Sequence, residues 1–133
     1  MSRLLIVDDE DPIRSMLYDL FEEAHSCHVA ETAEKAVQFL DTESYDVVLT
    51  DISMPGMSGI ELLGHIRQRQ SATPVIVISG VSDQSYAQGM IEMGAFDFLL
   101  KPFKLEKVEA SVARAIEHRR RLLNQPREES DKL

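Results

Sequence analysis

Cysteine is almost absent from this sequence of 133 residues, which contains Cys27 and no second thiol. No disulfide can therefore form within the chain, and a reducing, cytoplasmic compartment fits that composition best. Basic residues are also scarce, since 14 Lys and Arg stand against 23 Asp and Glu, for a formal net charge of -9. This excess of acid argues against nucleic-acid binding by the chain as a whole, because phosphate backbones favour basic surfaces.

Long apolar runs are lacking as well. The N-terminal stretch MSRLLIVDDE holds a short apolar run that ends in acids, so it predicts a strand and neither a signal peptide nor a membrane span. The sequence shows no solenoid-type repeat and no low-complexity tract. Its 44% hydrophobic and 28% charged residues are typical of a soluble globular protein, and its length suits one domain.

Short runs rich in Ile, Val and Leu recur along the chain and predict strands. Because these runs are continuously apolar and bounded by turn signals, they indicate strands buried on both faces, as in a parallel sheet. The strands are expected at residues 4–7, 27–30, 46–50, 75–79 and 96–100.

Apolar residues at helical spacing fill the gaps between these runs. Pro12 suits the first turn of a helix, and Ser58 with Glu61 three residues later matches a capping box. Asp83 is a candidate cap for a fourth helix over about 84–93. Other landmarks are Thr32 and Lys104 at helix starts, Gly94 just past the fourth helix, and Leu123 near the end of the fifth and longest.

Strand and helix signals thus alternate five times. This alternation predicts an α/β protein with a doubly wound (βα)5 fold, in which a five-stranded parallel sheet carries helices on both faces. The expected architecture is flavodoxin-like, with strand order 2-1-3-4-5. Residues 1–121 are expected to form the domain, and the polar stretch 122–133 a tail or the start of a linker.

Polar residues collect where the expected strands end. Asp8 and Asp9 follow the first strand, Asp51 follows the third, and Ser79 and Lys101 close the fourth and fifth. Ligands of open α/β sheets bind outside the carboxyl ends of the strands, so these side chains are expected to converge. Each residue also has a plain interpretation, as a helix-start acid, a loop residue or a strand exit. All of these plain interpretations would have to coincide at separate strand ends.

Three carboxylates in one place repel one another, so a cation or a bound proton must offset their charge. Oxygen ligands suit Mg²⁺ or Mn²⁺, and Mg²⁺ leaves room for a phosphate oxygen. The Lys101 ammonium can pair with a carboxylate at rest and with a phosphoryl oxygen later, while Ser79 offers a hydroxyl donor. A carboxylate can itself be the nucleophile and form an aspartyl phosphate. The pattern therefore predicts a phosphoryl-transfer site.

Four stretches carry a resemblance to the CheY-like receiver domains of two-component response regulators. They are LLIVDDE, DVVLTDISMPGMSGIELL, PVIVISG and GAFDFLLKPF, and they occur in order at the expected strand ends. The resemblance runs from about Arg3 to Arg119. It implies a cytoplasmic signalling protein of a phosphorelay rather than a multiple-turnover enzyme.

The resemblance implies roles for the acidic residues. Asp51 would accept a phosphoryl group from a sensor histidine kinase, a phosphotransfer protein or a small donor such as acetyl phosphate. Asp9 and Asp51 would bind Mg²⁺ through their carboxylates, together with the backbone carbonyl of Ser53. Asp8 would act mainly through a metal-bound water.

It also implies how phosphorylation is read out. Ser79 would be the switch hydroxyl, Phe98 the aromatic switch residue that rotates as Ser79 moves, and Lys101 the contact to a phosphoryl oxygen. The Lys101–Pro102 peptide would be cis, and Gly59 would allow a tight turn beside the site. Phe98 has an equally good interpretation as a core residue.

The partner would bind the face formed by the fourth helix, fifth strand and fifth helix. That partner would be an output domain, a separate protein or a second copy of the chain, without membrane or direct nucleic-acid binding.

Two other functions stay open on the residues. A pseudo-receiver would keep the fold as a protein-binding module without the chemistry, but such proteins usually lack one of the acids or the lysine. A phosphatase with an aspartyl-phosphate intermediate, similar to the haloacid dehalogenases, would need a second aspartate two residues after the nucleophile, where this chain has Ser53.

Overall fold

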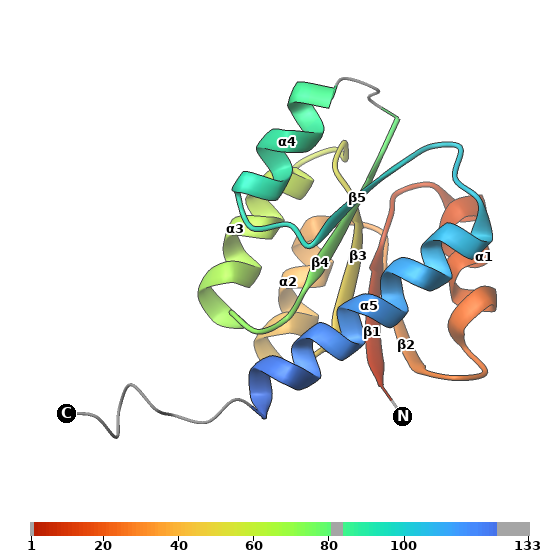
Figure 1. Ribbon diagram of the computed structural model, residues 1–133. Helices are drawn as coiled ribbons and strands as arrows, with labels where there is room; N and C mark the ends of the chain where they lie inside the picture. Colours follow the sequence, from red (N-terminus) through yellow and green to blue (C-terminus); the bar gives the residue numbers. More distant parts are fainter. Residues whose placement is uncertain (1, 81–83, 125–133) are drawn as a thin grey trace.

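Strands and helices alternate along the whole domain (Figure 1). The computed structural model describes residues 2–80 and 84–124, so the candidate cap Asp83 lies outside the described residues. Within these residues the strands are β1 Arg3–Val7, β2 Ser26–Ala30, β3 Val47–Asp51, β4 Val75–Ser79 and β5 Asp97–Leu100. The helices are α1 Asp11–Phe21, α2 Ala33–Thr42, α3 Gly59–Arg69, α4 Gln84–Glu92 and α5 Leu105–Leu123.

The strands form one parallel sheet in the order β2-β1-β3-β4-β5, which confirms the expected flavodoxin-like topology. The chain changes direction across the sheet between β1 and β3, which are neighbours. In their register Val7 lies opposite Thr50. The next residues along the two strands are Asp8 and Asp51, so the register alone brings these acids side by side.

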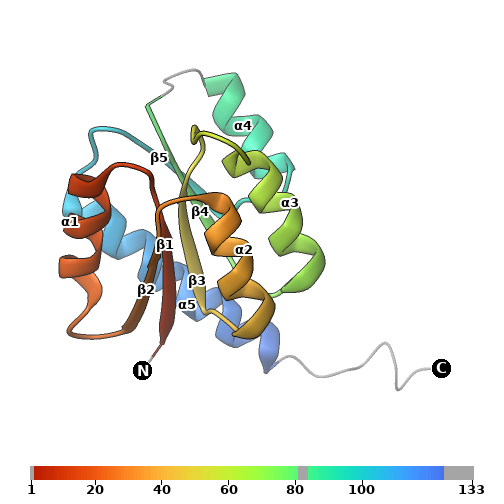
Figure 2. The same ribbon diagram turned by 180° about the vertical axis from the view of Figure 1, so that it is seen from behind.

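Helices cover both faces of the sheet. Figures 1 and 2 show α1 and α5 on one face and α2, α3 and α4 on the other. Each strand serves both layers because successive side chains point to opposite faces. In β1, Leu4 and Ile6 pack with buried residues of α1 and α5, whereas Leu5 and Val7 pack with those of α2, α3 and α4.

The central strands β3 and β4 are buried along their full length, as the apolar runs predict. β2 is half-buried over most of its length, and β5 has two half-buried residues and one exposed residue, so the expectation of burial on both faces is wrong for these two. They are the edge strands of the sheet, where one side has no neighbouring strand. β3 also extends one residue further than expected, which makes Asp51 its last residue.

Local signals set the helix starts as expected. The Ser58 side chain accepts a hydrogen bond from the Glu61 amide at 3.2 Å, and the Glu61 carboxylate accepts one from the Ser58 amide at 3.2 Å. This reciprocal pair is the predicted capping box. Thr32 caps α2 in the same way, through the amide of Lys35. Gly94 follows α4 with φ +106°, a conformation that glycine adopts without strain.

The amino end of the sheet is closed by the side chain of Gln70, just past α3. Its amide nitrogen donates to the carbonyls of Leu40 (2.9 Å) and Glu43 (2.8 Å). Its amide oxygen accepts from the Tyr45 backbone N–H and from the Thr73 hydroxyl, both at 3.1 Å. One side chain therefore joins the end of α2, the start of β3 and the loop before β4.

An ion pair fastens the last turns of α5 to the same end of the sheet. Arg119 donates to Asp46 at 2.9 Å, and the other carboxylate oxygen of Asp46 accepts the backbone N–H of Arg3 at 2.7 Å. Arg119 is the first of three consecutive arginines, Arg119–Arg121, near the end of α5. No helix of the described residues combines the length and apolarity needed to cross a membrane.

Candidate functional site

Four carboxylates gather at the carboxyl end of the sheet. Asp8 and Asp51 are buried there, with 1% and 4% of their surface exposed, whereas Asp9 and Glu10 are exposed. One carboxylate oxygen from each of the four lies within 4.8 Å of the others. The expected convergence of Asp8, Asp9 and Asp51 is therefore observed, and Glu10 joins them.

Lys101 reaches this cluster from the end of β5. Its ammonium nitrogen lies 3.0 Å from Oδ2 of Asp51, 3.1 Å from Oε1 of Glu10 and 3.6 Å from Oδ2 of Asp8. The Lys101 backbone N–H donates to the Ser79 carbonyl at 2.8 Å, which ties the residue to β4. The Lys101–Pro102 peptide is cis, as expected.

Burial and repulsion raise the proton affinity of Asp8. Loss of solvent is the main cause, and it raises the pKa of Asp8 to about 6, helped by repulsion from Asp51 and Glu10. Its hydrogen bond from the Glu10 amide and the nearby Lys101 work against this rise. Burial alone would lower the pKa of Lys101, but its hydrogen bonds to Asp51 and Glu10 and the negative charges of Asp8 and Asp51 together outweigh burial and raise that pKa to about 12.

The backbone around Asp51 is held closely by its neighbours. The Ser53 amide donates to Oδ1 of Asp51 at 3.2 Å, and the Thr50 hydroxyl donates to the Asp51 carbonyl at 2.9 Å. A Cβ added to Gly59 would lie 2.5 Å from that carbonyl oxygen and 2.6 Å from Cα of Ile52. Gly59 is thus required because α3 starts against the Asp51 backbone, whereas a positive φ is found at Gly56 and Gly94.

Ser79 and Phe98 lie on the neighbouring strands β4 and β5. Ser79 is buried at the end of β4, one residue beyond Ile78, which lies opposite Asp51 in the sheet register. Phe98 on β5 is half-buried and packs against the core beneath α2, α3 and α4. Phe98 therefore contributes to that core, and its role as a switch residue stays a prediction.

Two residues beside the cluster were not predicted from the sequence. One is Glu10, whose carboxylate contacts Lys101, and the other is Arg14. Arg14 lies on the first turn of α1, where its amide donates to the Glu10 carbonyl at 3.0 Å. Its guanidinium Nη1 donates to the backbone carbonyl of Asp8 at 2.8 Å, and Nη2 pairs with Asp11. The helical spacing of residues 10 and 14 was the available signal, but nothing local showed that Arg14 turns back toward β1.

A hard divalent cation fits these residues. Oδ2 of Asp8 is buried and accepts no hydrogen bond within the described residues. The Lys101 ammonium at 3.6 Å offsets only part of the negative charge there, because it also contacts Asp51 and Glu10. Carboxylate oxygens at this separation are the donor type that Mg²⁺ or Mn²⁺ prefers.

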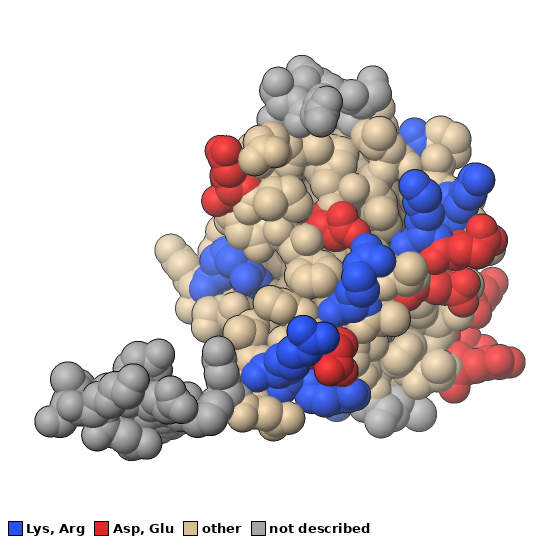
Figure 3. Space-filling view, in the orientation of Figure 1, with Lys and Arg blue, Asp and Glu red and all other residues tan. Residues whose placement is uncertain are grey.

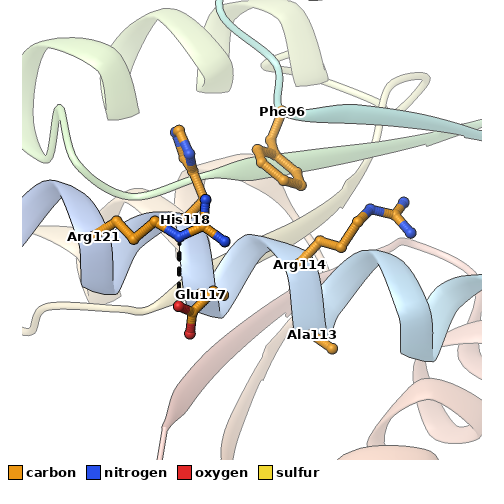
Figure 4. A pocket seen from close by; sticks show the side chains of 6 residues that line it. All are labelled: Phe96, Ala113, Arg114, Glu117, His118 and Arg121. Carbon is orange, nitrogen blue, oxygen red and sulfur yellow. Dashed lines mark hydrogen bonds and ion pairs between the residues drawn. The ribbon is translucent and has the colours of Figure 1, made fainter.

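Charge is distributed unevenly over the rest of the surface. Figure 3 shows acidic side chains over α1 and basic side chains along α5. A pocket of about 410 Å³ lies between α5 and Phe96, the residue before β5. It is lined by Phe96, Ala113, Arg114, Glu117, His118 and Arg121 (Figure 4). Its arginines are paired, since Arg114 contacts Asp97 at 3.1 Å and Arg121 contacts Glu117 at 3.4 Å. The pocket contains none of the clustered acids.

Comparison with known proteins agrees with this geometry. Residues 4–113 match the family model of the response regulator receiver domain. The DNA-binding transcriptional regulator NtrC of Klebsiella pneumoniae is 42% identical over 114 residues, which cover 85% of this chain and 24% of NtrC.

Two solved structures have the same fold. A receiver domain from Clostridium thermocellum superposes with a TM-score of 0.84 at 29% identity, covering 92% of this chain and 99% of that one. The response regulator TrrA of Thermotoga maritima, solved in complex with Mg²⁺ and BeF, has a TM-score of 0.77 at 33% identity, covering 86% of this chain and 99% of that one.

The fold and the acidic site at its strand ends define a signalling domain of the CheY-like class. The chain belongs to the response regulator receiver domain family. It spans about a quarter of the length of the curated relatives it matches.

Proposed function

We propose that Asp51 is the phosphoryl acceptor of this receiver domain. The observation that carries the proposal is the 3.0 Å contact between Lys101 and Asp51, beside Asp8, Asp9 and Glu10 at the switch point of the sheet. This combination places a nucleophilic carboxylate next to a fixed cation. It also leaves excess negative charge for a metal ion to neutralise.

The reaction transfers the phosphoryl group from a phosphohistidine to Asp51. A carboxylate oxygen of Asp51 forms the new P–O bond as the P–N bond to the donor imidazole breaks, and the departing ring takes up a proton from water. With acetyl phosphate, acetate leaves instead. The product is an aspartyl phosphate, in which the carboxylate charge is replaced by the larger charge of the phosphoryl group.

Asp9, Asp51 and the carbonyl of Ser53 would hold Mg²⁺ or Mn²⁺, with Asp8 acting through a bound water. The ion supplies neutralisation of the charge on the phosphoryl oxygens. Asp8 is suited to an outer role because its Oδ1 already accepts the Glu10 amide at 2.9 Å, while its Oδ2 is free of protein donors among the described residues.

Lys101 and Ser79 would then bind the new phosphoryl group. The Lys101 ammonium exchanges its contact with the Asp51 carboxylate for one with a phosphoryl oxygen, and the Ser79 hydroxyl donates to another oxygen. Phe98 lies on the strand next to Ser79 and follows its movement. Pro102 and Gly59 shape the backbone on either side of the site.

The phosphorylated state would be read at the face formed by α4, β5 and α5. The partners proposed are a sensor kinase or phosphotransfer protein as donor, and an output domain, another protein or a second copy of the chain as receiver of the signal. The domain would work in the cytoplasm, as a switch that turns over its own aspartyl phosphate and not an external substrate. Its boundary near residue 121 stays a prediction, because α5 continues to Leu123.

The test is direct phosphorylation of the protein. Wild type is incubated with Mg²⁺ and acetyl phosphate, and intact mass and peptide mapping are recorded. The expected result is one added phosphoryl group on Asp51. No phosphoryl group should be added when EDTA is present from the start, and none should be added to Asp51→Asn.

Asp46→Asn is the matched control. Asp46 immediately precedes β3 and therefore lies at the opposite end of the sheet from Asp51. Asp46→Asn should be phosphorylated like wild type. Incorporation that persists in Asp51→Asn at the wild-type rate, or none in wild type, would overturn the assignment of Asp51.

A further inference from the structure

We propose that Arg14 is a positioning residue for the metal site, a role that rests on the function proposed above. Its guanidinium fixes the turn that carries Asp8, Asp9 and Glu10, so that their carboxylates face Asp51. Within the described residues Arg14 contacts the backbone carbonyl of Asp8 and the carboxylate of Asp11, and not the clustered carboxylates.

The contacts of Asp8 show what Arg14 adds. The Asp8 amide donates to the Ala30 carbonyl at 3.1 Å, which continues the pairing of β1 with β2. Its carbonyl lies just past the strand and accepts Nη1 of Arg14 at 2.8 Å. Within the described residues, Arg14 is the donor that satisfies this carbonyl. Without Arg14 the peptide between Asp8 and Asp9 would be free to rotate, and with it the direction of both carboxylates.

Arg14 is itself held in place, as a positioning residue requires. Only 16% of its side chain is exposed, although its partner Asp11 is 81% exposed. Its Nη2 pairs with Asp11 in the first turn of α1, while Nη1 binds the Asp8 carbonyl. The planar guanidinium therefore joins the end of β1 to the start of α1. A pocket lined by Arg14, Ser15, Tyr18, Asp19 and Val29 lies alongside.

The shape of the guanidinium matters more than its charge in this account. Arg14 contacts the backbone carbonyl of Asp8 and not its carboxylate, so its contribution is to the geometry of the turn. Lysine would keep the charge but would present one nitrogen, which cannot reach the Asp8 carbonyl and the Asp11 carboxylate as two separate amines do. Arg14→Lys should therefore resemble Arg14→Met in metal binding.

The experiment measures Mg²⁺ affinity by isothermal titration calorimetry in wild type, Arg14→Lys, Arg14→Met and Arg69→Met. Arg69 is the matched control, because it is also a helical arginine in an ion pair, with Asp41 at 2.9 Å, but lies away from the acids. Both Arg14 variants should bind Mg²⁺ about tenfold more weakly, the size expected for loss of an outer support of metal ligands. Arg69→Met should bind like wild type.

Urea unfolding in EDTA separates positioning from general stability. Variants are compared at a temperature and pH where each is folded, and Arg14→Lys serves if Arg14→Met does not fold. A lowered urea midpoint with Mg²⁺ affinity within twofold of wild type would overturn the proposal. So would a normal affinity in Arg14→Lys. Wild type that neither binds Mg²⁺ nor takes up a phosphoryl group would instead remove the proposed function, and the role of Arg14 with it.

Discussion

The two ends of the parallel sheet use similar polar side chains but satisfy them to different degrees. At the amino end, both ends of the Gln70 amide group are hydrogen-bonded, and Asp46 meets Arg119 and a backbone N–H. At the carboxyl end, four carboxylates lie together, three of them share the ammonium of Lys101, and Oδ2 of Asp8 is buried without a hydrogen bond among the described residues. The first end stabilises the fold, and the second stores unfavourable charge that a ligand can relieve.

The largest effect on stability is expected from Gln70→Ala at the amino end. The change removes four hydrogen bonds and leaves the carbonyls of Leu40 and Glu43 and the Tyr45 N–H without this partner. Because buried polar groups that lose their partner carry a desolvation penalty, we expect a loss of about 3 kcal/mol in the free energy of unfolding. Urea denaturation measures it.

The control is Gln68→Ala, an exposed position two residues earlier, near the end of α3. It should change stability by less than about 0.5 kcal/mol. Mg²⁺ affinity of Gln70→Ala should stay near that of wild type. A large loss of affinity would show that the two ends of the sheet are coupled.

Gly59→Ala tests the carboxyl end by crowding it. The added methyl meets the Asp51 carbonyl oxygen at 2.5 Å, and backbone cannot move aside as a flexible side chain can. We expect a loss of about 2 kcal/mol, together with slower phosphorylation by acetyl phosphate. Gly64→Ala in the same helix meets nothing within 4 Å and should be neutral or slightly stabilising. Equal stability of the two variants would contradict the close approach at Gly59.

A smaller effect of opposite sign is expected from Asp8→Asn. It removes a buried charge that lacks a hydrogen-bond donor at one oxygen, so the metal-free protein should gain about 1 kcal/mol. The same change should weaken Mg²⁺ binding. Asp9→Asn, at an exposed position, should leave metal-free stability almost unchanged. Destabilisation of the metal-free protein by Asp8→Asn would show that the charge is already compensated.

The pH dependence of stability sharpens the same point. The pKa of Asp8 is about 6 in the folded protein and 3.8 ordinarily, so the folded state binds this proton more tightly than the unfolded state. Its contribution therefore lowers stability as pH rises from about 4 to about 6, and the loss persists above 6. In EDTA, the difference between Asp8→Asn and wild type should grow over this window. A constant difference from pH 4 to 7 would rule the shift out.

Much of the fold follows from local pattern. Continuous apolar runs identify β3 and β4, and Ser58 with Glu61 identifies the start of α3. The site was also predictable, because the carboxyl ends of parallel strands meet at one edge whatever the details of packing. Strand register then decides that Asp8 and Asp51 are neighbours.

What could not be predicted depends on contacts between distant segments. Gln70 and Tyr45 are 25 residues apart, and Arg119 and Asp46 are 73 apart, so no local spacing marks either pair. Arg14 is near Asp8 in sequence, but its role depends on the direction its side chain takes from α1. The edge strands were misjudged for a similar reason, since burial depends on neighbours and not on composition.

The Arg119–Asp46 pair has a mechanical consequence. Asp46 immediately precedes β3 and Asp51 is the last residue of that strand, so only the buried residues 47–50 lie between the ion pair with α5 and the acidic cluster. β3 therefore connects the proposed acceptor Asp51 at one end to the last turns of α5 at the other. A shift of β3 along its own axis would move both Asp51 and the Asp46 carboxylate that binds Arg119.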